Sequence, residues 1–99
     1  MATVLLVGSR DDMTKQVAAS LRAQGWDVVP VVGPEDGLRA IDRTPQVDAL
    51  VVGGPAAFAA RGRLEARLHE RHPYAPVVFP TSVDGIGKDL ARAFGGEAH

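Results

Sequence analysis

Four short apolar runs, each followed by a segment with helical spacing, constrain the fold of this chain most strongly. None of the runs alternates apolar with polar residues along its length, which is typical of strands covered on both faces. The runs are Val4–Val7, Val28–Val32, Val47–Val52 and Val77–Phe79. Strands that alternate with helices indicate a parallel sheet. We therefore expect an α/β fold with a four-stranded parallel sheet in the order 2-1-3-4 and helices on both faces.

The first helix is expected to begin just after Ser9. This serine precedes Asp12 by the three residues of a capping box. Met13, Val17 and Leu21 follow at four-residue spacing and are expected to form the inner face of the helix.

Proline and glycine mark the other boundaries. Pro30 cannot donate a hydrogen bond to a ladder, so the second strand is expected at an edge of the sheet or with a bulge. Pro34 is suited to the first turn of a second helix. A third helical segment covers roughly residues 56–72, and Gly62 predicts a late start or a break in it. A fourth helix is marked by Ile86, Leu90 and Phe94.

Length and charge exclude several classes of function. The 99 residues are expected to form one domain, residues 1–99. The net charge of −1, from 11 basic and 12 acidic residues, gives no general attraction to nucleic acid or to an anionic membrane. No cysteine is present, which excludes disulfides and thiolate chemistry. The apolar start is too short for a signal peptide or a membrane span, so the expected location is the cytoplasm.

The order of these features resembles the receiver domain of bacterial response regulators. The resemblance runs without a gap from Val4–Val7 to Gly25-Trp26-Asp27-Val28-Val29, which mirrors the entry to the family's second strand. It continues in Asp48–Val52, the run before the phosphoacceptor, and in residues 76–82, where Thr81 falls on the family's hydroxyl position. The resemblance implies a flavodoxin-like fold and a role in signalling.

The departures from that family concern its chemistry. A receiver holds Mg²⁺ with two acids after the first strand, where this chain has Gly8 and Ser9. The phosphoacceptor position is Gly53, and the family's lysine, fifth strand and fifth helix have no counterpart. Asp11 and Asp12 stand three positions too late and are interpreted as favourable charges at a helix N-terminus. The resemblance therefore implies a degenerate, truncated receiver that is not an enzyme and has no metal or other cofactor.

The strand ends provide a candidate anion site in place of the lost acids. Small residues, a hydroxyl and an arginine at a strand-to-helix turn can bind an anion through backbone amides and the helix dipole. The candidate residues are Gly8, Ser9, Arg10, Gly53, Gly54, Thr81 and Ser82. Such a site would hold phosphate, a nucleotide or the carboxylate of a partner. The competing interpretation is that the glycines serve tight turns only.

The fourth strand provides a candidate interface, because an apolar edge strand is a template for pairing with another chain. The expected contact residues are Val77, Val78 and Phe79 on the strand and Ile86 and Leu90 on the helix after it. The leading hypothesis is a pseudo-receiver that binds a protein partner or itself as a homodimer in signalling. The alternative is a small-molecule binding domain for phosphate or a nucleotide, and an enzyme acting on such a ligand has little support.

The third helical segment carries a basic stripe. Arg63, Arg67 and Arg71 stand at four-residue spacing, as in helices that meet phosphate backbones. Because Glu65 and Glu70 dilute the stripe, we interpret it as a solvated face.

Overall fold

The computed structural model describes residues 2–80 and 85–93, which form nine helices and strands. Thr81, Ser82 and Phe94, named above as site or helix residues, lie outside these ranges. The described elements are β1 (Thr3–Gly8), α1 (Asp11–Ala23), β2 (Asp27–Val32), α2 (Pro34–Arg43), β3 (Ala49–Val52), α3 (Pro55–Ala59), α4 (Arg61–Arg71), β4 (Val77–Val78) and α5 (Ile86–Ala93).

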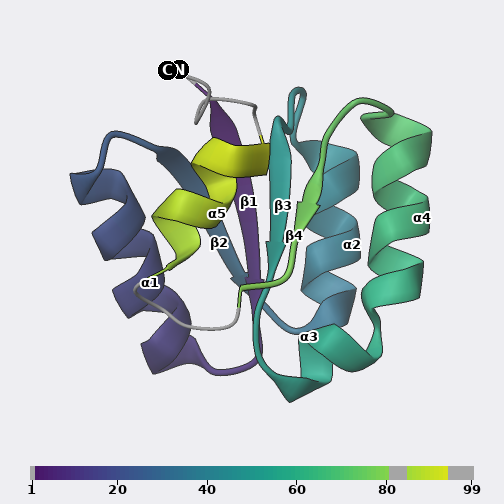
Figure 1. Cartoon of the computed structure of the whole chain (residues 1–99). Helices are drawn as coiled ribbons and strands as arrows, with labels where there is room; N and C mark the ends of the chain where they lie inside the picture. The colour runs from purple at the N-terminus through teal and green to yellow at the C-terminus, as the bar shows by residue number, and fades with distance from the viewer. Residues whose placement is uncertain (1, 81–84, 94–99) are drawn as a thin grey trace.

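The strands form one parallel sheet in the order β2-β1-β3-β4, which confirms the predicted topology. Val4 of β1 lies opposite Val28 of β2 and Ala49 of β3, and Leu50 lies opposite Val77. Strand β2 is outermost on its side, which agrees with the edge position predicted from Pro30. All four arrowheads point to the end of the molecule where α3 lies (Figure 1).

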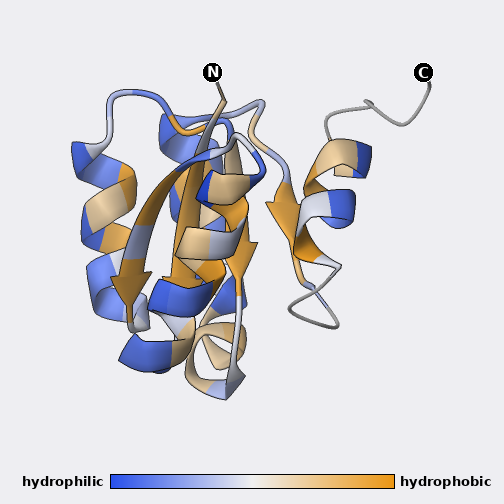
Figure 2. Cartoon of the chain, turned by 90° about the vertical axis from the view of Figure 1, so that its left-hand side faces the viewer, coloured by the Kyte–Doolittle hydropathy of each residue, from blue (hydrophilic) through white to orange (hydrophobic). Residues whose placement is uncertain are grey.

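Helices cover both faces of the sheet, as predicted. Helices α1 and α5 pack on one face, and α2, α3 and α4 pack on the other (Figure 1). The strands supply residues to both hydrophobic clusters because successive side chains point to opposite faces. Val4 and Leu6 belong to the cluster under α1, whereas Leu5 and Val7 belong to the cluster under α2 and α4. Figure 2 shows the strands as the most hydrophobic part of the chain.

The start of α1 differs from the prediction. The N-cap residue is Arg10, and no side chain caps the helix, so the capping box predicted from Ser9 and Asp12 is wrong. The buried face of α1 consists of Thr14, Val17, Ala18 and Leu21, whereas Met13 is 41% exposed. The buried positions are residues 14, 17, 18 and 21, and Met13 lies at the edge of the face that they form.

The third helical segment is two helices, and the break lies at Ala60 rather than at the predicted Gly62. Ala60 ends α3 and starts α4, with φ −99° and ψ 13°. Its N–H bonds back to the carbonyls of Ala57 and Phe58, which closes the short α3 before the chain turns. Gly62 lies within α4, and nothing stands within 4 Å of where its Cβ would be.

The basic stripe of α4 is paired with acids of α2. Arg63 binds Glu35 at 2.7 Å, and Arg67 and Arg71 both bind Asp42, at 2.6 and 3.2 Å. The stripe is solvent-exposed, as interpreted from the sequence, but its cations are largely committed to the neighbouring helix. These pairs link the exposed faces of α4 and α2, so the stripe is not a free basic surface.

Candidate functional site

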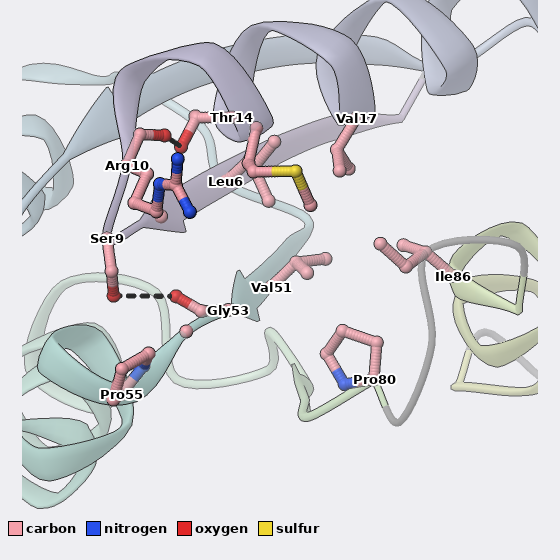
Figure 3. Close-up of a pocket in the computed structure, with 13 residues that line it drawn as sticks. Leu6, Ser9, Arg10, Thr14, Val17, Val51, Gly53, Pro55, Pro80 and Ile86 are labelled. Atoms are coloured by element: carbon pink, nitrogen blue, oxygen red, sulfur yellow. Dashed lines mark hydrogen bonds between the residues drawn. The ribbon is translucent and has the colours of Figure 1, made fainter.

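A cavity of about 340 Å³ lies at the carboxyl ends of β1 and β3, between α1 and α5. The side chains that line it are mainly apolar, and Figure 3 shows Ser9 and Arg10 at one end and Pro80 and Ile86 at the other. Its apolar lining includes Leu6, Met13, Val17, Val51, Pro80 and Ile86. The cavity occupies the place where ligands bind in open parallel sheets.

Ser9 joins the end of β1 to the start of α3. Its hydroxyl donates to the carbonyl of Gly53 at 3.1 Å and accepts the N–H of Ala57, also at 3.1 Å (Figure 3). Ala57 is the third residue of α3, whose own N-cap residue is Gly54 and has no side chain. Ser9 therefore caps the N-terminus of α3, although it is distant from this helix in the sequence. Both roles of its hydroxyl are taken by the backbone.

The two glycines after β3 have different physical roles. Gly54 has φ +83°, and a Cβ there would stand 2.5 Å from the Ser9 hydroxyl oxygen. Gly53 does not have a positive φ, and a Cβ there would meet no atom within 4 Å. The turn therefore requires glycine at position 54, as expected if the glycines serve tight turns. Gly53, which takes the receiver family's phosphoacceptor position in the resemblance, faces open space.

Thr14 fills the space next to Gly8. Its side chain is buried, and its hydroxyl donates to the carbonyl of Arg10 at 2.5 Å. A Cβ on residue 8 would overlap this hydroxyl. The apolar spacing of α1 does not identify Thr14 as a buried residue. A small polar residue opposite a glycine does, however, indicate that the two residues approach closely. A longer side chain at position 8, such as an acid, does not fit beside Thr14 as it stands.

Among the described residues that line the cavity, Arg10 is the one with a charged side chain. Its side chain is largely exposed and reaches Asp12 at 3.5 Å, while Asp11 pairs with Lys15 at 3.1 Å. The structure thus brings together Gly8, Ser9 and Arg10 with Gly53 and Gly54 around one cavity, as the candidate anion site required. The hydroxyl expected to bind the anion is nevertheless committed to the backbone.

An exposed aromatic cluster, formed by Phe58, Arg61 and Phe79, lies on the other face of the sheet. The rings of Phe58 and Phe79 meet edge to face, with centroids 5.7 Å apart, and the guanidinium of Arg61 lies 4.1 Å above the Phe58 ring. Phe58 is 46% exposed and Phe79 is 40% exposed. Phe58 is an apolar position of the third helical segment, and the sequence pattern does not mark it as exposed. The period of two along the strand places Phe79 on the same face as Val77, towards α3.

The predicted interface residues do not form one surface. Ile86 and Leu90 lie on the inner face of α5 and are buried against the sheet, so the expectation that they meet a partner is wrong. Their four-residue spacing places both side chains on the inner face of the helix, where they pack in the hydrophobic core. Val78 is also buried, and Val77 is partly buried against the α4 side. Phe79 is the predicted interface residue that remains substantially exposed in the described structure.

Polar contacts at the opposite end of the sheet are structural. Asp48 accepts the Thr3 N–H at 2.7 Å and the Gln46 side-chain amide at 2.8 Å. The Thr3 hydrogen bond, followed by that of Gln46, holds the pKa of Asp48 below its ordinary value of 3.8, while burial acts the other way. The His72 ring contacts the Ile41 carbonyl and the Val47 N–H, at 3.1 and 3.4 Å.

The described residues contain no group of three histidine, cysteine, aspartate or glutamate side chains that could hold a metal ion. Within the same ranges, no helix is long and apolar enough to cross a membrane. Comparisons with protein-family models, with curated proteins and with solved structures find no match to this chain.

Proposed function

We propose that this chain is a cytoplasmic, receiver-like signalling module that is not phosphorylated and that acts by pairing with a second copy of itself. The observation that carries the proposal is the exposed aromatic cluster of Phe58, Arg61 and Phe79 beside the outermost strand β4. Large aromatic side chains at such exposure are enriched where proteins meet, because they bury much apolar area with few rotatable bonds.

The strand ends support the part of the proposal that concerns phosphorylation. A receiver site needs an acid at the end of β3 and two acids after β1. Gly53, Gly8 and Ser9 stand at these positions. Ser9 is bonded to the backbone on both sides, and Thr14 occupies the space beside Gly8. These contacts leave no carboxylate at the cavity to bind Mg²⁺ or to accept a phosphoryl group in the described structure.

The edge of β4 favours side-chain contact over strand pairing. The strand is two residues long, and Pro76 and Pro80 flank it without N–H groups. Short edge strands with proline are a known protection against edge-to-edge pairing. A partner is therefore expected to be held mainly by the aromatic side chains on either side of the strand.

The positions of those aromatics favour a second copy as the partner. Tyr74, which is 97% exposed, precedes β4, and Phe79 follows it. Tyr74 lies in the turn before β4, where the Ala75 N–H bonds to the His72 carbonyl at 3.1 Å. A two-fold axis beside β4 would bring the segment from Tyr74 to Phe79 of each copy against the same segment of the other copy. Such a contact uses the same patch twice, as symmetric dimers do.

Light scattering during size-exclusion chromatography tests the proposal. The wild-type chain is expected to elute with the mass of a dimer, and Phe79→Ser with the mass of a monomer. Met13→Ser is the matched control, since Met13 is 41% exposed against 40% for Phe79 and lies on the α1 side of the sheet. A wild-type chain that stays monomeric into the millimolar range contradicts the proposal, and so does a Met13→Ser variant that dissociates equally.

A further inference from the structure

We infer that the cavity between α1 and α5 binds a small monoanion with an apolar body, such as a medium-chain carboxylate, rather than phosphate or a nucleotide. This inference does not depend on the proposed dimer. The cavity lies on the α1 and α5 face, whereas the aromatic cluster lies on the α3 and α4 face.

The volume of the cavity limits the size of the ligand. Small-molecule sites measure about 300 to 1,000 Å³, so a cavity of about 340 Å³ is at the small end. At roughly 30 Å³ for each water-sized group, it accommodates about ten heavy atoms. An eight-carbon carboxylate has this size and can be buried whole, whereas a nucleotide, about twice as large by the same measure, would extend out of the cavity.

The lining determines the chemistry of the ligand body. Leu6, Val17, Val51 and Ile86 present hydrocarbon to the cavity, with Pro80 at the same end as Ile86 (Figure 3). A phosphate group would need several hydrogen-bond donors at this place. Both hydroxyls of the lining already donate to backbone carbonyls, that of Ser9 to Gly53 and that of Thr14 to Arg10. An apolar body therefore fits the cavity without leaving a polar ligand group unpaired.

Arg10 determines the charge of the ligand. It lies at one end of the cavity, and its contact with Asp12 is long and exposed, at 3.5 Å with both side chains mostly in solvent. Exposed pairs of this kind contribute little, so a carboxylate can replace Asp12 as the partner at low cost. Asp11 is engaged by Lys15 and does not line the cavity. One cation at the mouth of an apolar cavity matches one anionic group on an apolar molecule.

Gly53 allows the cavity to be blocked without disturbing the core. It lines the cavity, it does not need a positive φ, and a Cβ there meets no atom within 4 Å. Gly53→Leu is therefore expected to fold and to place its side chain in the open space. Gly62→Leu is the matched control, because its Cβ also meets nothing and it lies on α4.

The test is calorimetric titration of the intact chain with octanoate, octan-1-ol and inorganic phosphate. We expect saturable octanoate binding to the wild type and to Gly62→Leu, and none to Gly53→Leu. Arg10→Gln is expected to weaken octanoate binding by up to roughly fivefold and to leave octanol binding unchanged. Met13→Asp, at an exposed rim position, is the second blocking variant and is expected to weaken octanoate binding.

Four results would overturn this inference. The first is absence of saturable octanoate binding to the wild type. The second is competition by phosphate at concentrations comparable to those of octanoate, which would indicate a phosphate site. The third is unchanged octanoate binding in both Gly53→Leu and Met13→Asp, which would place the bound molecule elsewhere. Equal affinity for octanol and octanoate would overturn the monoanion assignment.

Discussion

Ser9 and Gly54 lie so close together that a Cβ on residue 54 would stand 2.5 Å from the Ser9 hydroxyl oxygen. The two residues come from different strand ends, and Ser9 also bonds to residues on both sides of Gly54, at the Gly53 carbonyl and the Ala57 N–H. The turn after β3 is therefore fixed by a contact with the turn after β1. This contact sets the edge of the cavity and the start of α3.

Gly54→Ala is expected to lower the free energy of unfolding by about 3 kcal/mol. The φ of +83° with ψ of 164° suits glycine almost alone, and the added methyl would also collide with Ser9. Urea denaturation followed by circular dichroism measures the effect. Gly62→Ala is the control and is expected to raise stability by less than about 1 kcal/mol, because Gly62 is exposed in the first turn of α4 and alanine has the higher helix propensity. Equal stability of Gly54→Ala and wild type would contradict the described turn.

Ser9→Ala is expected to cost about 1 to 2 kcal/mol of unfolding free energy. The change leaves the Ala57 N–H of α3 without its acceptor, as in the loss of an N-cap side chain. Ser20→Ala provides the comparison, since Ser20 is exposed on α1, and its effect is expected within about 0.5 kcal/mol. If Ser9→Ala were as mild as Ser20→Ala, Ser9 would not cap α3.

Gly8 and Thr14 are expected to be energetically coupled. Gly8→Ala should destabilise the chain strongly because the new methyl overlaps the Thr14 hydroxyl. Adding Thr14→Ala removes that hydroxyl, so the double variant should be about 1 to 3 kcal/mol more stable than the sum of the single changes. Chemical denaturation of the four chains in the cycle gives the coupling. Additive effects would mean that Thr14 does not restrict position 8.

The stability of the chain is expected to fall at low pH in part through Asp48. Hydrogen bonds from Thr3 and Gln46 lower the pKa of this carboxyl in the folded state, so the folded state favours its charged form. The resulting stability is fully present above the unfolded-state pKa and is lost as the pH falls through the lower folded-state pKa.

Unfolding free energies of wild type and Asp48→Asn, measured from neutral pH to below pH 3.8, test this expectation. The wild type should be the more stable chain near neutral pH, and the difference should shrink as the pH falls below that value. A difference that stays constant with pH would show that the charge of Asp48 does not stabilise the folded state.

The sheet could be predicted from the sequence because its strands are buried runs whose apolar character does not depend on distant contacts. Val4–Val7 and Val47–Val52 identify two such strands directly, and Pro30 places a third at an edge. The order 2-1-3-4 is expected because it is the order of flavodoxin-like sheets, and the structure has this order. This part of the fold rests on local composition and general topology.

The details of the site could not be predicted in the same way because they depend on contacts between distant residues. Ser9 matched a local capping box, yet its hydroxyl serves α3, 48 positions away. Met13 matched the apolar period of α1, but its side chain borders the open cavity and is partly exposed. Phe58 is exposed on the short helix α3, whose buried residue is Ala57. The glycines at 53 and 54 look alike in the sequence, and they are distinguished by the positive φ of Gly54 and by its approach to Ser9.

Native mass spectrometry after incubation with acetyl phosphate and Mg²⁺ reads phosphorylation and assembly in one spectrum. We expect a dimer of two unmodified chains of 10.4 kDa each. A chain that gains the mass of a phosphoryl group would contradict this expectation, and so would a chain that remains a monomer at every concentration.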